Sequence, residues 1–357
     1  MSRKFFAVVF VLIMSVALVL SGCSSKKEPK EALQNAAANT FKLDSYVLNN
    51  QIKIKDLSIN FPNADDPSVN AMATMLKNAE INVSQVYQKD PMQTEATMEI
   101  KLQGDVATTI TIPFVMTKDK WFVKIPQVPF LPLPDTVVGK FLVIDLKEMA
   151  KQGGEDFNPD MLNPEKSQKL AAEITNAVFA EYDGKTYFKD IDPKDAALPE
   201  GTKAKQVVQF NVTNDNVKDA VTIFVKQALP KILDILNKDE YRQMLQIKPE
   251  DLADAKKELA AGDDTEFNKA LADMQKYLSI NTFTINTAID KNDYPVYQKL
   301  DASLDFNDPD TKENVKVAFE VSSAFSKINE KPEFKIGIPT NTITMDQFEQ
   351  EVGALGY

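Results

Sequence analysis

The chain has 357 residues, of which 43% are hydrophobic and 26% are charged. This balance is typical of a soluble globular protein, because it is too charged for a mostly membrane-embedded chain and too apolar for a disordered one. The length suits one large domain or two of ordinary size. With 41 Lys and Arg against 52 Asp and Glu, the net charge is −11. This charge argues against a nucleic-acid partner, whose phosphates attract a basic surface.

The chain has no histidine and a single cysteine, Cys23. Without histidine it lacks the most common general base near neutral pH and the most common zinc ligand. One cysteine forms no intramolecular disulfide, no Cys–His dyad and no cysteine-rich metal site. We therefore expect neither a resident metal nor a cofactor.

The N-terminal residues have the pattern of an export signal. Arg3 and Lys4 precede an apolar run over residues 5–20, which is short for a transmembrane helix of about 20 apolar residues. The run ends in a sequence that resembles a bacterial lipobox, in which the cysteine thiol receives the lipid: Leu20, Ser21, Gly22 and Cys23. The alternatives are a simple secretory signal with an incidental cysteine, or an uncleaved anchor.

The signal divides the chain into three parts. Residues 1–22 are predicted to be a lipoprotein signal peptide, residues 23–30 the lipidated Cys23 and a flexible tether, and residues 31–357 a single domain. Each buried lipid CH₂ contributes about 0.8 kcal/mol to membrane affinity, so two or more acyl chains anchor a protein stably. We therefore expect a lipid-anchored protein at the extracytoplasmic face of the cell membrane. Because the body is acidic, the lipid rather than its overall charge is expected to hold it there.

Alternation of apolar and polar residues predicts strands in the first half of the domain. The apolar positions over residues 45–61 change parity near Lys55 and Asp56, which predicts a β-bulge. In chain order, the pattern predicts a helix at 30–41, the strand at 45–61, a helix at 67–79, an antiparallel meander over 80–125, a stiff proline-rich stretch at 128–134 and a short strand at 141–144.

The second half has a long helical section at about 216–278 between strands. The pattern predicts helices at 165–182, 216–237, 249–261 and 264–278, and strands at 187–188, 206–212, 283–289, 294–306 and 315–325. Pro230 should kink the helix at 216–237, and a short helix is expected from Met345. The order of helices and strands predicts an α+β fold with a large antiparallel sheet.

Two phrases carry a resemblance to a known group. Leu43-Asp44-Ser45-Tyr46 leads from the first helix into the long strand, and a second phrase spans residues 285–296, INTAIDKNDYPV. With the lipobox, the sequence resembles bacterial cell-envelope lipoproteins of the LolA/LppX-like superfamily. The resemblance implies a strongly curved antiparallel half-barrel with helices plugging its concave side, which often encloses an apolar cavity of acyl-chain size. The helical section at 216–278 is longer than the usual plug, which leaves open that protein fills this space.

Seven apolar residues of the predicted strands are the candidates for a cavity lining: Phe114, Met116, Trp121, Val123, Phe283, Ile285 and Phe319. One interpretation is ordinary core, because a flat sheet buries such side chains against helices. The other is a lining for a lipid or another apolar ligand, because a curved sheet leaves space.

The acidic residues offer a weaker hypothesis, since paired carboxylates cleave glycosides. Two clusters stand out: Asp263, Asp264 and Glu266, and Asp305, Asp308 and Asp310. Both adjoin predicted turns or helix starts, where acids act as caps. A calcium loop would need Gly at its sixth place and Glu at its twelfth. Asp310 and Lys316 stand there instead, so no metal or catalytic residue is assigned.

The sequence thus leaves three hypotheses. The first is a non-enzymatic, membrane-anchored envelope lipoprotein that binds or shields a lipid or other apolar ligand. The alternative is an envelope interaction or scaffold lipoprotein with a filled core and a protein partner. The third is a carboxylate-dependent hydrolase.

Overall fold

The computed structural model describes residues 26–40, 42–60, 74, 76–102, 107–128, 133–148, 163–261, 264–308 and 313–353. The predicted signal peptide, Cys23 and most of the predicted helix at 67–79 lie outside these residues, as does most of the proline-rich stretch.

One open sheet of twelve strands organises the described residues, in the order β12-β6-β5-β4-β3-β2-β1-β11-β10-β9-β8-β7. All neighbours are antiparallel except β12 and β6, which are parallel. The strands are β1 (Ser45–Asn60), β2 (Glu80–Gln88), β3 (Gln93–Leu102), β4 (Thr108–Thr117), β5 (Lys120–Lys124), β6 (Phe141–Asp145), β7 (Phe188–Ile191), β8 (Gln206–Asn211), β9 (Leu278–Ile289), β10 (Pro295–Asp308), β11 (Glu313–Ser326) and β12 (Thr342–Thr344).

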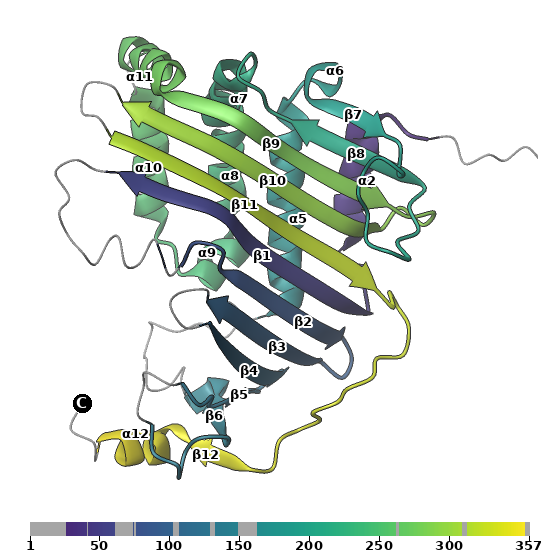
Figure 1. The fold of residues 1–357 in the computed structure, drawn as a ribbon, viewed down its shortest axis with the longest axis vertical. Helices are drawn as coiled ribbons and strands as arrows, with labels where there is room; N and C mark the ends of the chain where they lie inside the picture. The colour runs from purple at the N-terminus through teal and green to yellow at the C-terminus, as the bar shows by residue number, and fades with distance from the viewer. Residues whose placement is uncertain are drawn as a thin grey trace, which may run out of the picture.

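Most of the described helices lie on one face of this curved sheet, behind it in Figure 1. They are α2 (Pro29–Thr40), α5 (Pro164–Glu181), α6 (Gly184–Tyr187), α7 (Val217–Ile223), the π-helix η3 (Phe224–Ala228), α8 (Leu229–Leu236), α9 (Asp239–Leu245), α10 (Pro249–Ala261), α11 (Asp264–Tyr277) and α12 (Met345–Gly353). The arrangement confirms the predicted α+β fold, a large curved antiparallel sheet with helices on its concave side.

The bulge in β1 lies where the apolar parity changes. Ile54 pairs with Phe319, but the register shifts before Asp56, and Leu57 then pairs with Val317. The extra residue, Lys55, restores the apolar side chains to one face of the sheet. The predicted bulge is confirmed.

Two details of the helical half differ from the prediction. The expected helix at 216–237 is divided into α7, η3 and α8, and η3 ends just before Pro230. Proline has no N–H and its ring crowds the preceding turn, so the regular helical bonds are interrupted there. Tyr187 belongs to α6 rather than to a strand, because the Asp183 carboxylate accepts bonds from the N–H groups of Lys185 and Thr186.

The largest core cluster lies between α2, the end of α5 and strands β7–β9. It includes Leu33 and Ala36 from α2, and Phe188 and Phe210 from the sheet. Phe179 of α5 contacts the rings of both phenylalanines, at centroid distances of 5.7 and 5.3 Å. Full burial of such side chains stabilises the fold by about 1.5–3 kcal/mol each. This cluster therefore fixes the helices to one half of the sheet.

A long C-terminal segment leaves β11 and crosses to the far edge of the sheet (Figure 1). The buried carboxylate of Glu95, on β3, accepts hydrogen bonds from the backbone N–H groups of Lys335, Ile336 and Gly337 at 2.6–2.9 Å. The segment then forms β12 beside β6. Glu95 thus fastens the C-terminal segment to the outer face.

Candidate ligand-binding face

All seven predicted lining residues lie on one face of the sheet. Directly paired residues of antiparallel strands share a face. Phe114 pairs with Val123 and Met116 pairs with Trp121, while Ala302 pairs with both Phe283 and Phe319. The register connects the two groups through Ile54, Ile52, Ile81, Ile100 and Ile110.

Phe283 and Ile285 belong to the helix-covered half of this face. Both pack against the core cluster that contains Leu33 of α2 and Phe210 of β8. Ordinary core is therefore the interpretation that fits these two residues. They pack against protein side chains in the half of the sheet where the helices lie.

The predicted lining residues of β4 and β5 have a different environment. Together with two neighbours they form what we call the β4–β6 patch: Ile112, Phe114, Met116, Trp121, Val123 and Ile144. All six are only half-buried, and in Figure 1 no described helix lies behind β3, β4 or β5. On the same face, Ile52 of β1 is 41% exposed. The apolar face thus continues beyond the described helices.

Two unpartnered polar atoms adjoin the β4–β6 patch. Thr94 pairs with Met116, which in turn pairs with Trp121, so the three form one cross-strand row. Within the described part of the chain, the Trp121 Nε1 and Thr94 Oγ1 atoms are buried without a hydrogen-bond partner. Leaving such a group unbonded costs about 1–3 kcal/mol.

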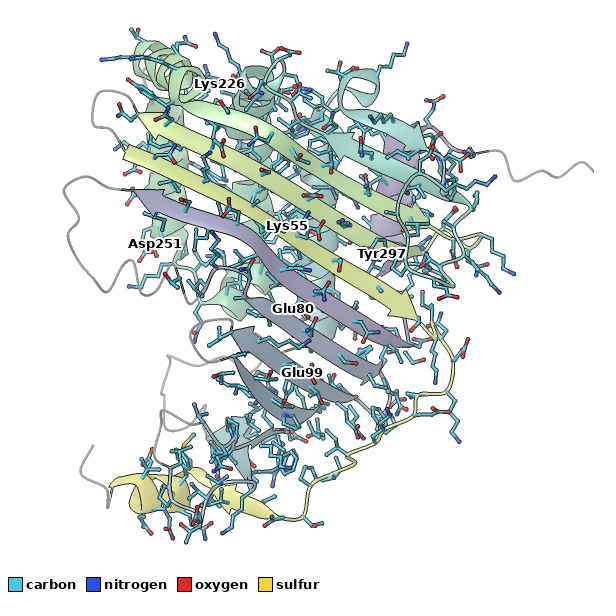
Figure 2. The ribbon with its side chains drawn as sticks, in the orientation of Figure 1. Lys55, Glu80, Glu99, Lys226, Asp251 and Tyr297 are labelled. Carbon is cyan, nitrogen blue, oxygen red and sulfur yellow. The ribbon has the colours of Figure 1, made fainter. Side chains whose placement is uncertain are left out.

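The opposite, outer face of strands β1, β10 and β11 carries ion pairs. Glu320 Oε1 lies 2.6 Å from the Nζ atoms of both Lys55 and Lys299. Partial burial disfavours the Glu320 carboxylate, but hydrogen bonds from the two lysines outweigh it and lower its pKa to about 2. Figure 2 displays Lys55, Glu80 and Glu99 on the side of the sheet turned to the viewer. The ion pairs thus lie on the outer face of these strands, whereas the outer-face residues Val115 and Phe122 of β4 and β5 are buried.

The predicted acidic clusters lie only in part within the described residues. Asp264 begins α11 and Asp305 lies within β10, 3.8 Å from Lys316. Asp263 and Asp310 lie outside the described residues, and Asp308 ends β10. The described residues contain no group of three or more His, Cys, Asp or Glu that could hold a metal ion. The described parts of the two clusters thus lie on different elements, α11 and β10.

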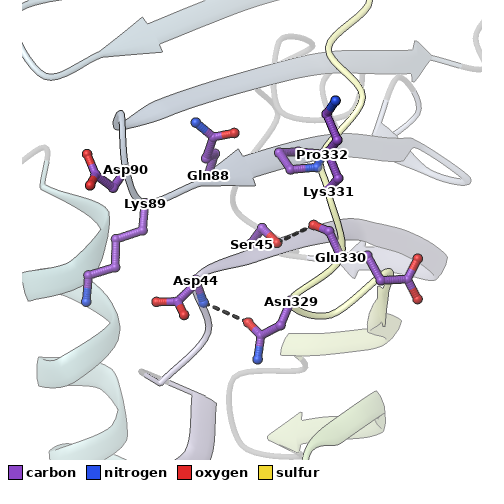
Figure 3. A pocket seen from close by; sticks show the side chains of 9 residues that line it. All are labelled: Asp44, Ser45, Gln88, Lys89, Asp90, Asn329, Glu330, Lys331 and Pro332. Atoms are coloured by element: carbon purple, nitrogen blue, oxygen red, sulfur yellow. Dashed lines mark hydrogen bonds between the residues drawn. The ribbon is translucent and has the colours of Figure 1, made fainter.

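Two grooves lie at the end of the sheet where the strands turn. One, of about 510 Å³, lies among Asp44, Lys89 and Asn329 (Figure 3). There the Asp44 N–H donates to Asn329 Oδ1 at 2.8 Å and the Ser45 hydroxyl donates to the Glu330 carbonyl at 2.6 Å. The larger groove, of about 1190 Å³, lies between residues 199–205, the β9–β10 turn and the end of β11. Neither groove is lined by a residue of the β4–β6 patch.

Sequence reasoning found four of the six patch residues and missed Ile112 and Ile144. The alternation that identified Phe114 also places Ile112 on the same face. Ile144 pairs with Trp121, a contact that depends on the register of β5 and β6. The predicted lipobox, with Leu20, Ser21, Gly22 and Cys23, lies outside the described residues.

A family model matches part of the chain. Residues 235–344, from α8 to β12, match DUF6612, a family of unknown function. No curated protein matches the chain. Of the described helices, none combines the length and the apolar character needed to cross a membrane.

Proposed function

We propose that this protein is a lipid-anchored lipoprotein of the cell envelope, not an enzyme, that binds or shields a lipid or another apolar ligand. The observation that carries the proposal is the half-buried β4–β6 patch, on the side of the sheet where the helices lie. The lipobox ending at Cys23 supports the anchor. The helix–sheet arrangement accords with the resemblance to the LolA/LppX-like superfamily.

The proposed mechanism is burial of apolar surface. Removing apolar surface from water contributes about 25 cal/mol per Å², or about 0.8 kcal/mol for each CH₂ group. A row of branched and aromatic side chains along β4, β5 and β6 suits an extended acyl chain. The Trp121 indole N–H is buried and has no partner in the described residues; it would donate to an oxygen of a ligand that displaces the side chains covering it. An amphiphile with one oxygen near its chain therefore fits better than a pure hydrocarbon.

A protein partner is the second candidate, and one observation favours it. The other half of the apolar face is already filled by helix side chains, including Leu33 and Phe179. An apolar segment of a partner would cover the β4–β6 patch in the same way. This candidate predicts a purified protein without bound lipid.

Mass spectrometry tests the proposal with a matched pair of variants. Residues 25–357, without the lipidation site, are produced in a bacterial host, purified gently and analysed by native mass spectrometry and lipid extraction. We expect stoichiometric lipid on the unaltered protein and at least about tenfold less on Phe114→Glu, because burying an unpaired carboxylate against an acyl chain is costly.

Thr111→Glu is the control, since it adds the same charge to an exposed position on the outer face of β4. It should keep its lipid. Circular dichroism establishes that both variants are folded. A lipid-free mass for the unaltered protein, with no uptake of a fluorescent fatty acid, would favour the protein partner instead.

A further inference from the structure

The first described residues of the chain are fixed to one end of the sheet. The backbone carbonyl of Lys27 accepts a hydrogen bond of 2.8 Å from Gln206 Nε2, at the start of β8. The Gln206 side chain is 1% exposed and also donates to Asp190 Oδ1 at 2.8 Å. Lys27 Nζ in turn lies 2.9 Å from Asp293 Oδ2. Both the backbone and the side chain of Lys27 are therefore held.

Asp293 connects Lys27, which we call the tether root because it is the fixed residue of the predicted tether, to other elements. It lies in the turn between β9 and β10, with a positive φ of 61°. Its Oδ1 atom is 3.2 Å from Lys205 Nζ, and its carbonyl accepts a bond from Asn39 Nδ2 of α2. Hydrogen bonds from Lys27 and Lys205 hold the pKa of the Asp293 carboxyl below its usual value. Hydrogen bonds and ion pairs thus join Lys27 to α2, to the start of β8 and to the β9–β10 turn.

The chain between Cys23 and Lys27 is short. Four residue steps span at most about 14 Å when fully extended. If Cys23 carries the acyl chains, Lys27 lies within that distance of the lipid headgroups. We propose that the end of the sheet formed by the β9–β10 turn and residues 199–205 rests against the membrane surface. This inference depends on the proposed lipid attachment at Cys23.

Lysines and acidic residues both line this end of the sheet. Lys203 and Lys291 line the groove beside the β9–β10 turn, and Lys26 directly precedes the fixed root. All three are exposed, and so are Glu200 and Glu330 of the same groove. The carboxylate of Asp290 is occupied by the backbone N–H groups of Asn292 and Tyr294. Lys26, Lys203 and Lys291 are thus available to phospholipid phosphates, while the short tether rather than net charge carries the orientation.

Energy transfer to the membrane tests the orientation in the full-length, acylated protein. Because the one native cysteine would carry the lipid, an introduced cysteine is a unique site for a fluorophore. The label is placed at Asn292→Cys, in the β9–β10 turn, or at Asp346→Cys, in the remote helix α12. The protein is reconstituted in phosphatidylcholine–phosphatidylglycerol vesicles that contain an acceptor lipid. We expect roughly threefold or more transfer at position 292 relative to 346, given a tether of about 14 Å.

A longer tether provides the control. Twenty Gly and Ser residues inserted after Ser25 leave the fixed root unchanged but should lower transfer at position 292 toward the value at 346. Equal transfer at both positions in protein that floats with the vesicles would overturn the proposed orientation while leaving the anchor intact. A protein that does not float, and whose mass shows no acyl chains, would overturn the anchor as well.

Discussion

Single side chains on the outer face contribute to stability through charge. Glu320 lies among Lys55, Lys299 and Asp301, on three adjacent strands. Since its pKa is lowered to about 2 from 4.5, the folded state favours the ionised carboxylate. The resulting stabilisation is fully present above the unfolded pKa of 4.5 and is lost as the pH falls toward 2.

The first prediction concerns this residue. Glu320→Gln should lower the free energy of unfolding at pH 7 by about 1–3 kcal/mol, since both lysines lose a charged partner. The deficit should shrink between pH 4.5 and pH 2. Urea denaturation at pH 7 and pH 3 measures the difference in free energy of unfolding between the variant and the unaltered protein. Glu99→Gln, on the same face, is the control and should have little effect at either pH; an equal loss in both variants would contradict the assigned role of Glu320.

The site was predictable at the residue scale only in part. Alternation places Phe114 and Trp121 on the same side of their strands, and the structure confirms a common face. Alternation does not reveal which tertiary neighbour covers each side chain. Phe283 and Trp121 are both aromatic residues at alternating positions of predicted strands. Nevertheless, Phe283 packs within the helix-covered core, whereas Trp121 lies half-buried on β5.

Long helices and strands with a regular apolar pattern were predictable from the sequence. The shortest elements were not. Long strands such as β1 and β10 carry many alternating positions. Even the bulge at Lys55 is visible in the sequence, because the apolar positions of β1 change parity there. The helix α9 has only seven residues and β12 only three, too few for a periodic pattern. β12 exists because the C-terminal segment returns to the edge at β6, a long-range contact with no local signal.

The second prediction concerns that C-terminal segment. Glu95→Ala removes the shared acceptor of three backbone N–H groups, those of residues 335–337. Amide hydrogen exchange in this segment should become faster by about tenfold or more, since each lost bond contributes on the order of 1 kcal/mol. Mass spectrometry of peptic peptides measures the exchange. Unchanged protection at residues 335–337 would mean that other contacts hold the segment.

At the scale of the whole molecule, the helices divide the sheet into two halves. In one half, α2 and α5 pack against β7–β9 and enclose the aromatic core. In the other, β4–β6 present apolar residues that remain half-buried. Composition and periodicity predicted the α+β class, but not this division, because the placement of helices depends on contacts distant in the chain. The division explains why one sheet suits both a filled core and a ligand-binding face.

The most direct test of lipid binding uses Trp121, the only tryptophan in the chain. Because it lies in the β4–β6 patch, its fluorescence reports on that patch alone. Titration with a dibrominated fatty acid, whose bromine atoms quench tryptophan at close range, should give saturable quenching near one ligand per protein. The unbrominated fatty acid should restore the emission. Binding of the fatty acid without quenching would place the ligand elsewhere, and no binding at all would contradict the proposed function.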